Sequence, residues 1–345
     1  MSNASSTSGT AYANLDWTQY IRYRPSYPPS LRKLIYRYHT RNAPGKSTNP
    51  DASTHWDSLL DVGGGIGISS VPFIRDFRTV HLLDPSPLNH EKARVFLAEH
   101  VSVNNLQTKL EFTIAKAEEY PNKRSVAADS GASLAICAST AHFIDPDMLI
   151  KSMYKSIRPG GTVAIYSYWL PVFPDLDPAL SVEYTKTVTR AMRLCIRDEA
   201  TRNVFSDAVA RLCGGTTVMD AIAVPGDLFE GIQRIQINTQ TALSLDTFRE
   251  DPAVPFTPLD SQVREQEDKC TYVSATDAEA EGWTMSVDLD FLHGMIRTIL
   301  PADIQLSKEQ HEELYGNLDR TFAAECLSGS TLAMWGLDMI LATRR

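Results

Sequence analysis

A glycine-rich stretch next to an apolar run constrains the fold of this chain most strongly. The stretch Leu60–Gly67 (LDVGGGIG) overlaps the apolar run Ser58–Val62 and precedes Ile68–Phe77, which predicts the order strand, loop, helix. Glycine permits a tight turn, and the missing Cβ lets a ligand lie against the backbone. A helix after such a turn offers unpaired N–H groups. This order is typical of an open α/β sheet that holds a ligand at its strand ends.

Short apolar runs alternate with amphipathic segments from Trp56 to Trp169, which predicts successive βα units. Further strands are expected at Thr79–Asp84, Leu110–Ala115, Ala132–Ala138 and Thr162–Tyr168, and helices at Asn89–Asn104 and Met148–Ile157. Pro159-Gly160-Gly161 is expected to form a turn that ends the last of these helices. We therefore predict a Rossmann-like, doubly wound α/β fold with a mostly parallel seven-stranded sheet, an antiparallel C-terminal strand and a helical cap.

The composition of the chain changes along its length, and this change predicts five segments. They are a disordered leader (1–16), an N-terminal helical flap and loop (17–55), a ligand-binding core (56–170), a cap with one or more sheet strands (171–330) and a last sheet strand (331–345). In the cap we expect helices at Pro178–Cys213, Val287–Leu300 and Lys308–Leu327, a strand at Gly231–Thr239 and a polar lid loop at Leu245–Asp277. The stretch Asn42–Thr54 is expected to be a surface loop.

The net charge and the cysteine positions restrict the classes of partner that the protein can have. Of the 345 residues, 33 are Lys or Arg and 42 are Asp or Glu, which gives a net charge of −9 and disfavours nucleic acid as the main partner. No apolar run approaches the roughly 20 residues of a membrane-spanning helix. The five cysteines are scattered without a C-x-x-C pair, which disfavours both a disulfide framework and a metal site. We expect a cytoplasmic protein without a membrane, metal or nucleic-acid partner.

The spacing of the glycines discriminates between two ligand classes. A dinucleotide fingerprint needs G-x-G-x-x-G/A, but the sixth position counted from Gly63 is Ile68. The loop instead reads G-x-G-x-G, with Asp61 two residues before its first glycine. A carboxylate there repels a pyrophosphate but attracts the ammonium group of an amino acid. The spacing therefore favours an adenosyl amino acid.

Two later acidic positions agree with this choice. Asp84 ends the second predicted strand, where a carboxylate can accept both hydroxyls of a ribose. Ala117-Glu118 follows the third predicted strand, near the place where an adenine ring would lie. The alternative is a tight βα turn that binds no ligand. It is disfavoured because the glycine loop with Asp61, the acid Asp84 and the step Ala117-Glu118 occur in the expected order.

Residues 59–168 resemble a class I S-adenosylmethionine-dependent methyltransferase. In that family the glycine loop, the acid that ends strand two and the acid after strand three contact the methionine, ribose and adenine parts of the cofactor. The resemblance implies that role here for Asp61, Gly63, Gly65, Gly67, Asp84, Pro85, Ala117, Glu118 and Ser139.

A narrower resemblance, to the fungal trans-aconitate methyltransferase-like branch, rests on four short stretches: Tyr23–Pro28, Asp84–Ser86, Ala117–Glu119 and Ala141–Phe143. The chain departs from that family at Gly64, where Cys or Ala is frequent, and at Phe143, where Trp is common.

The loops after the fourth and fifth strands are expected to face the donor methyl group, because ligands lie outside the carboxyl ends of the strands. His142 could act there as a base or orient the acceptor, or it could cap a helix or pack beside the adenosine. Arg24 and Arg297 are candidates to hold a carboxylate acceptor, although solvated surface charges are the commoner case. Tyr20, Tyr27 and Trp169 could form an aromatic wall around the positively charged methyl group, or simply pack in the core or lid.

The leading hypothesis is a methyltransferase of small-molecule, secondary metabolism. It would methylate an oxygen of a carboxylate or natural-product hydroxyl by SN2 transfer, and S-adenosyl-L-methionine would be the cofactor. Two alternatives keep the fold without methyl transfer: a cyclase or pericyclase that uses the sulfonium as a fixed charge, and a cofactor-binding protein without catalysis. A nicotinamide dehydrogenase is disfavoured by the glycine spacing.

Overall fold

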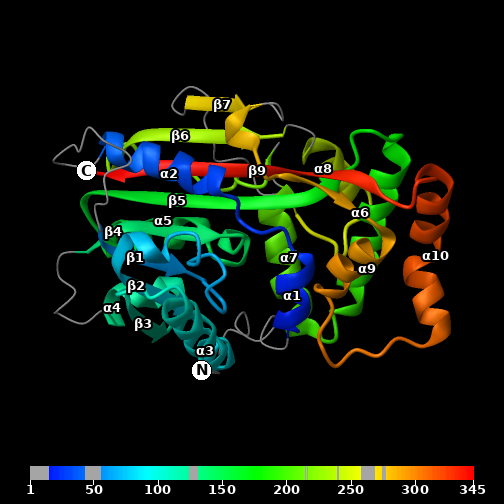
Figure 1. Cartoon of the computed structure of the whole chain (residues 1–345), viewed down its shortest axis with the longest axis horizontal. Coiled ribbons are helices and arrows are strands. Elements are labelled where there is room, and N and C mark those ends of the chain that lie inside the picture. Colours follow the sequence, from blue (N-terminus) through cyan, green and yellow to red (C-terminus); the bar gives the residue numbers. More distant parts are fainter. Residues whose placement is uncertain are drawn as a thin grey trace.

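The computed structural model describes residues 15–42, 56–123, 131–213, 215, 217–238, 241–257, 269–273 and 277–345. Its centre is one twisted sheet with helices on both faces, and a group of helices stands at one end of the two longest strands (Figure 1). The expected loop at Asn42–Thr54 and most of the expected leader lie outside the described residues. Leu15 and Asp16 belong to the folded part, because Leu15 is buried and the Asp16 side chain accepts hydrogen bonds from the first turn of a helix.

Among the described residues the sheet has nine strands. They are β1 (Trp56–Val62), β2 (Phe77–Asp84), β3 (Lys109–Ile114), β4 (Ala132–Ala138), β5 (Ile157–Val172), β6 (Phe229–Ile237), β7 (Lys269–Val273), β8 (Thr284–Val287) and β9 (Thr331–Arg344). Their order is β3-β2-β1-β4-β5-β9-β6-β7, with β8 paired to one end of β9. All pairs are parallel except those that β9 makes with β5, β6 and β8.

This sheet confirms the predicted fold class, a mostly parallel sheet with an antiparallel C-terminal strand between layers of helices. It has two strands more than the predicted seven. The added strands are β7, which extends the edge beyond β6, and β8, which pairs with the part of β9 around Met334. Both are short strands inside segments whose polar composition hid them from periodicity.

Ten α-helices surround the described part of the sheet: α1 (Trp17–Tyr23), α2 (Pro29–Asn42), α3 (Pro87–Val103), α4 (Tyr120–Lys123), α5 (Pro146–Ser156), α6 (Pro178–Leu194), α7 (Glu199–Cys213), α8 (Thr241–Glu250), α9 (Leu289–Arg297) and α10 (Lys308–Glu325). Helices α3 and α5 begin alike, with an oxygen of Ser86 or Asp145 capping the first turn and a proline in it. A cap oxygen and an early proline are the expected start signals, because neither leaves an N–H unpaired. No helix within these described segments is long and apolar enough to cross a membrane.

Three local predictions were wrong. Ile68–Phe77 is a series of turns that ends in a short 3₁₀ helix (Ile74–Asp76), because Ser69 and Ser70 turn their hydroxyls back to Asp61. Pro159-Gly160-Gly161 lies inside β5 rather than in a turn, next to a register shift in the pairing with β4. The described part of the expected lid loop contains α8 and β7.

Strand β9 is the centre of the antiparallel half. Twelve of its fourteen residues are buried and the other two are half-buried, and it carries one acid, Asp338. Its two carboxylate oxygens accept from Gln236 Nε2 (3.1 Å) and Val218 N (3.4 Å). Burial raises the pKa of Asp338 to about 7, and nearby Asp220 raises it further while Arg234 lowers it.

Raising the pH from 5 to 8 is expected to lower the free energy of unfolding of the wild-type protein by about 2 kcal/mol more than that of Asp338→Asn. Folded Asp338 keeps its proton up to about pH 7, whereas the unfolded chain loses it near about pH 4. Unfolding therefore releases a proton between these values, and the folded state loses stability as the pH rises. Urea titrations at both pH values measure the difference. The exposed control Asp175→Asn should follow the wild type; an Asp338→Asn protein that also does so would contradict the shifted pKa.

Candidate functional site

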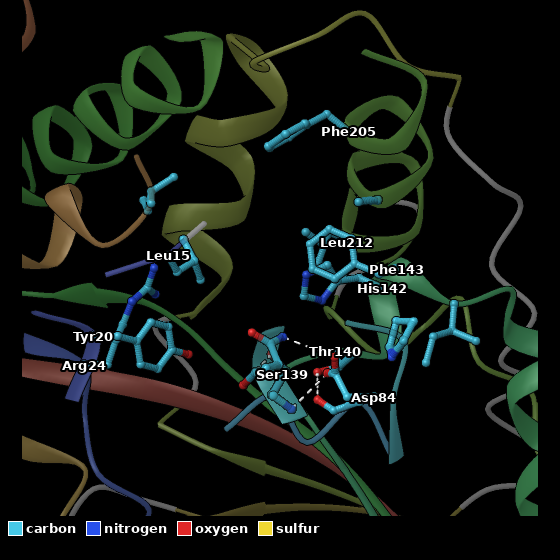
Figure 2. Close-up of a pocket in the computed structure, with 18 of the residues that line it drawn as sticks. Leu15, Tyr20, Arg24, Asp84, Ser139, Thr140, His142, Phe143, Phe205 and Leu212 are labelled. Atoms are coloured by element: carbon cyan, nitrogen blue, oxygen red, sulfur yellow. Dashed lines mark hydrogen bonds between the residues drawn. The ribbon is translucent and has the colours of Figure 1, made fainter. Parts of the chain in front are cut away.

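A cavity of about 270 Å³ opens at the carboxyl ends of β1, β2, β4 and β5. Its floor is formed by the glycine loop and by the residues that follow the strands. The cap helices α6 and α7 form the wall opposite this floor, and α1 forms one side. Figure 2 shows Asp84, Ser139 and Thr140 on the floor, Tyr20 and Arg24 on one side, and His142, Phe143 and Leu212 on the other.

The glycine loop has a backbone that side chains would disturb. Gly63, Gly65 and Gly67 all have positive φ, at 69°, 56° and 92°. A Cβ on Gly63 would collide with the Thr140 side chain, and one on Gly67 would lie 2.6 Å from Leu97 Cδ1. Gly63 and Gly65 line the cavity, whereas Gly67 allows α3 to pack closely and does not line it. The predicted contact between Gly67 and a cofactor is therefore not supported by its place.

Asp61 lies beneath the loop rather than in the cavity. Its Oδ2 accepts hydrogen bonds from Ser69 Oγ and Ser70 Oγ, both at 2.6 Å, and its side chain fills the space under Gly64. Burial raises the pKa of Asp61 to about 6, although the two hydroxyls lower it. The side chain does not line the cavity. Asp61 is thus placed to brace the loop through Oδ2, and its contact with an ammonium group stays a prediction.

Asp84 is one of two acidic residues that line the cavity, together with Glu118. It ends β2 and is only 6% exposed. Its Oδ1 accepts from Ser86 N (2.9 Å) and Asn89 Nδ2 (3.1 Å), and its Oδ2 accepts from Gly65 N (3.0 Å). A carboxylate oxygen has two lone pairs, so Oδ2 keeps acceptor capacity beside the loop. Asp84 therefore orders the glycine loop and presents an acceptor to a ligand.

The remaining predicted floor residues also lie along the cavity. Pro85, Ala117, Glu118 and Ser139 all line it. Ser139 follows β4 with a φ of 51°, an uncommon conformation for a residue other than glycine, and such outliers cluster at functional sites. Its Oγ accepts from Tyr27 Oη at 3.4 Å.

Helix α1 brings the N-terminal residues to the cavity. Tyr20 and Arg24 line it, and the Arg24 guanidinium lies 5.3 Å from the centre of the Tyr20 ring. Arg24 Nε donates to Thr298 Oγ1 at 2.7 Å, which ties α1 to the end of α9. Trp17 approaches Gly65 so closely that a Cβ there would lie 3.1 Å from its ring. The N-terminal segment thus forms the side wall of the cavity.

A second hollow of about 240 Å³ shares the glycine loop with the first. Trp17, Tyr20, Arg24, Gly63 and Gly65 line both, together with Ser139, Thr140 and Tyr168. Tyr27 lines only the second hollow, where its ring meets Tyr166 edge-on. Burial raises the pKa of Tyr27 well above its usual range, so its phenol stays neutral.

His142 stands at the side of the cavity opposite α1. It belongs to a 3₁₀ turn (Ala141–Phe143) after β4, its ring centre lies 4.0 Å from that of Phe143, and its carbonyl oxygen accepts from Arg211 Nη1. Burial, aided by Arg211, lowers the pKa of His142 to about 3. The imidazole is therefore neutral at physiological pH and can accept a hydrogen bond from an acceptor hydroxyl.

The cap supplies an apolar wall that the sequence prediction missed. Its members come from α6, α7 and the end of β5: Leu170, Val188, Met192, Phe205, Ala208, Val209 and Leu212. The predicted Trp169 also lines the cavity, with its ring edge-on to Phe248 on α8. The signal was present as the apolar face of Pro178–Cys213, but only the fold shows where that face points.

Arg297, like Asp61 and Gly67, is a candidate that lies outside the cavity. It lies near the end of α9, and its Nη2 donates to Ile304 O at 2.8 Å. It lines a separate hollow on the other side of α1 and α9, and not the cavity. The next two residues, Thr298 and Ile299, do line the cavity. Arg297 therefore misses the cavity by a single residue along the chain.

Polar residues that sequence reasoning did not select complete the floor. Thr140 Oγ1 donates to Gly63 O (3.1 Å) and Asn89 anchors Asp84, while Lys116 and Ser167 line the cavity beside them. Thr140 directly follows Ser139, so the end of β4 was a sufficient signal for it. No group of three potential metal ligands occurs in the described ranges.

Comparison with known proteins agrees with this geometry. Residues 60–165 match the family described as a methyltransferase domain. The probable S-adenosylmethionine-dependent methyltransferase CRG1 of Saccharomyces cerevisiae is 29% identical over 178 residues, which are 51% of this chain and 54% of that protein. The methyltransferase AacuQ of Aspergillus aculeatus is 22% identical over 337 residues, which are 95% of this chain and 93% of that protein. Among solved structures, the YcgJ protein of Bacillus has a TM-score of 0.40 at 14% identity, and covers 85% of this chain and 94% of its own.

The chain spans about half the length of the first curated relatives that it matches. The family match and the likeness to CRG1 support a methyltransferase domain with S-adenosylmethionine as its cofactor. None of them singles out the trans-aconitate methyltransferase-like branch, so that narrower resemblance stays a prediction.

Proposed function

We propose that this chain, whose residues 60–165 match a methyltransferase domain, transfers a methyl group from S-adenosylmethionine to an oxygen of a small, largely apolar molecule. One observation carries the proposal. A single cavity joins the glycine loop and Asp84 to the apolar wall of α6 and α7. A donor held at one end would thus share an enclosed space with an acceptor held at the other.

The residues of the floor fit the cofactor. Asp84 Oδ2 has acceptor capacity for a ribose hydroxyl, and Gly63 and Gly65 leave backbone room where a Cβ would intrude. Ala117 and Glu118 would border the adenine, and the phenols of Tyr20 and Tyr27 would lie near the charged end. When bound, S-adenosylmethionine supplies an electrophilic methyl group on a sulfonium, and SN2 attack by the acceptor oxygen breaks the bond between sulfur and carbon.

The acceptor end of the cavity selects for shape and low polarity. Met192, Phe205, Val209 and Leu212 offer apolar surface that an aliphatic or aromatic acceptor would remove from water. Each buried aromatic or branched contact favours such an acceptor by about 1 kcal/mol or more. Water is displaced at the same time, which protects the donor from hydrolysis.

Two polar side chains face the acceptor, and they suit two kinds of oxygen. Neutral His142 can accept the proton of a hydroxyl group as the oxygen attacks. Arg24 can hold a carboxylate, which needs no base because it is already ionised at pH 7. The two side chains lie on opposite sides of the cavity (Figure 2), so the acceptor's polar group would be drawn to one of them.

The direct test is the formation of S-adenosylhomocysteine. The chain is incubated with S-adenosylmethionine and a panel of hydrophobic carboxylic acids, phenols and aliphatic alcohols, and the by-product and the methylated ether or ester are both measured. Binding of S-adenosylmethionine is followed separately by calorimetry. Tight binding without by-product across the panel would argue against methyl transfer, whereas equal turnover of small hydrophilic acceptors would contradict the role of the apolar wall.

Substitution of His142 separates the two kinds of acceptor. His142→Gln is expected to lower kcat about tenfold with a hydroxyl acceptor. This effect is smaller than the roughly 10²- to 10⁴-fold that is typical of general-base catalysis, because a pKa of about 3 makes His142 a weak base. With a carboxylate acceptor, His142→Gln should leave kcat unchanged. Arg24→Gln should instead weaken the binding of that acceptor, which is seen as a raised KM. Steady-state kinetics with one phenol and one carboxylic acid measure both. If both acceptors respond equally to His142→Gln, the histidine acts on packing rather than on the proton.

A further inference from the structure

A third hollow lies behind the wall that α1 and α9 form at the active-site cavity. It measures about 490 Å³ and is called the α9 groove here. Residues from α1, α9, the segment after α9, and α10 line it: Gln19, Tyr23, His293, Gly294, Arg297, Ile304, Gln305, Leu306, His311 and Tyr315. None of these residues lines the active-site cavity or the neighbouring hollow, so the α9 groove is a separate feature.

The α9 groove contains one permanent positive charge, the guanidinium of Arg297. Arg297 is held in place by its bond to Ile304 O, which leaves other N–H groups of the guanidinium available. His293 Nε2 bonds to Asp319 Oδ1 at 2.6 Å, and Tyr23 Oη donates to Asp290, so both nearby acids are already engaged. Asp303 also interacts electrostatically with Arg297, but both terminal nitrogens of Arg197 already donate to its carboxylate.

One side of the α9 groove is a stack of flat rings. The His293 ring stacks on that of Tyr315 at an angle of 29°, with 4.2 Å between the ring centres, and the centre of the His311 ring lies 4.8 Å from that of Tyr315. Tyr315 is buried, whereas His311 is exposed. A flat ligand can therefore lie against this stack while its charged end reaches Arg297.

The wall between the two cavities is thin. Gly294 on α9 packs so closely against the Tyr23 ring that a Cβ there would collide with it. On the other face of the same wall, Arg24 Nε bonds to Thr298 Oγ1, and both residues line the active-site cavity. Helix α1 thus has Tyr23 in the α9 groove and Trp17, Tyr20 and Arg24 at the glycine loop. A ligand that fixes Tyr23 also fixes the residues that cover the loop.

We propose that the α9 groove is an effector site for a small aromatic carboxylate, whose binding holds α1 in place and tightens the binding of S-adenosylmethionine. The carboxylate lies on Arg297, and the ring lies along His293, Tyr315 and His311. Binding itself does not depend on the proposed methyl transfer. The effect on the cofactor is a coupling free energy between two sites, and such a coupling commonly changes an affinity by about 5- to 150-fold.

The first experiment measures binding to the full chain by calorimetry with benzoate as the probe. Saturable binding is expected, and neutral benzamide of the same shape should bind at least about tenfold more weakly because it lacks the charge for Arg297. Arg297→Gln should weaken benzoate about tenfold or more, and the matched variant Arg320→Gln, an exposed arginine of α10 that pairs with Glu312, should not. Equal binding of benzoate and benzamide, or the absence of saturation, would overturn the proposal.

Two further variants serve as controls for the benzoate titration. Because Arg297 also holds Ile304 O, its loss could loosen the segment after α9; the exposed His311→Ala tests the ring stack without that contact and should weaken benzoate severalfold. Loss of binding in Arg24→Gln with retention in Arg297→Gln would place benzoate in the active-site cavity and would overturn the groove assignment.

The second experiment measures the Kd of S-adenosylmethionine with and without saturating benzoate. A Kd lower by about fivefold or more is expected in the wild type and in Arg320→Gln, and no change is expected in Arg297→Gln. An unchanged or higher Kd in benzoate-saturated wild type would overturn the effector role. Failure of the methyltransferase proposal shows up differently, as cofactor binding without S-adenosylhomocysteine, so the two failures are distinguishable.

Discussion

Asp84→Ala is expected to weaken the binding of S-adenosylmethionine about a thousandfold, the largest effect of any single change in the floor. The substitution removes the acceptor for the ribose, and a hydrogen bond to a charged group contributes about 1.5 to 3 kcal/mol. It also leaves Gly65 N, Ser86 N and Asn89 Nδ2 without their common partner, so the glycine loop loses its shape. Calorimetric titration of the purified variant measures the loss.

A matched control separates the site from general damage to α3. Glu91→Ala removes an exposed carboxylate from the first turns of that helix and should bind the cofactor as the wild type does. Asp84→Asn keeps one oxygen acceptor and should bind with intermediate affinity. If Asp84→Ala unfolds at the same urea concentration as the wild type and still binds S-adenosylmethionine normally, Asp84 does not hold the ribose.

The second large effect is expected at Gly63. Gly63→Ala should weaken the cofactor about a hundredfold and destabilise the protein by about 3 kcal/mol, since an alanine at a φ of 69° costs about 1 to 2 kcal/mol and its Cβ collides with Thr140. The collision pushes apart the loop and the end of β4, which together form the floor. Cofactor titration and urea unfolding measure the two effects.

Two variants divide the Gly63 effect into its causes. Thr140→Ser in the Gly63→Ala background removes the methyl group that collides but keeps the hydroxyl that donates to Gly63 O, and should restore about tenfold of the affinity. Gly329→Ala has a similar φ of 78° with nothing within 4 Å of its Cβ, so it reports backbone strain alone, far from the cofactor. No recovery in the double variant would show that the collision is not the cause.

The sequence predicted the part of the fold in which neighbouring segments carry their own signal. Strands β1, β2, β4 and the core of β5 follow apolar runs that parallel strands bury on both faces. The positions after those strands then follow from topology, which is why Gly63, Gly65, Asp84, Glu118 and Ser139 all line the cavity. Their contact with the cofactor stays a prediction. β7 and β8 were missed because short strands in polar surroundings have no periodicity to detect.

Side-chain direction was the harder problem. Asp61 has the position of a ligand-binding acid, but only the structure shows Ser69 and Ser70 turning it inward. Arg297 has the right chemistry for an anion, and one residue further along α9 would have placed it in the cavity. The apolar wall depends on how α6 and α7 dock over the sheet, which is a long-range property that no local pattern contains.

Strand β9 has a consequence for how the chain reaches its folded state. It lies between β5 and β6 in the sheet, yet it follows both by about a hundred residues or more in the sequence. Until it is available, β5 and β6 each present an open row of peptide groups, the kind of edge that recruits other chains. Synthesis on the ribosome therefore passes through a long interval in which half of the sheet has no central strand, and protection by a chaperone during that interval would matter most to yield.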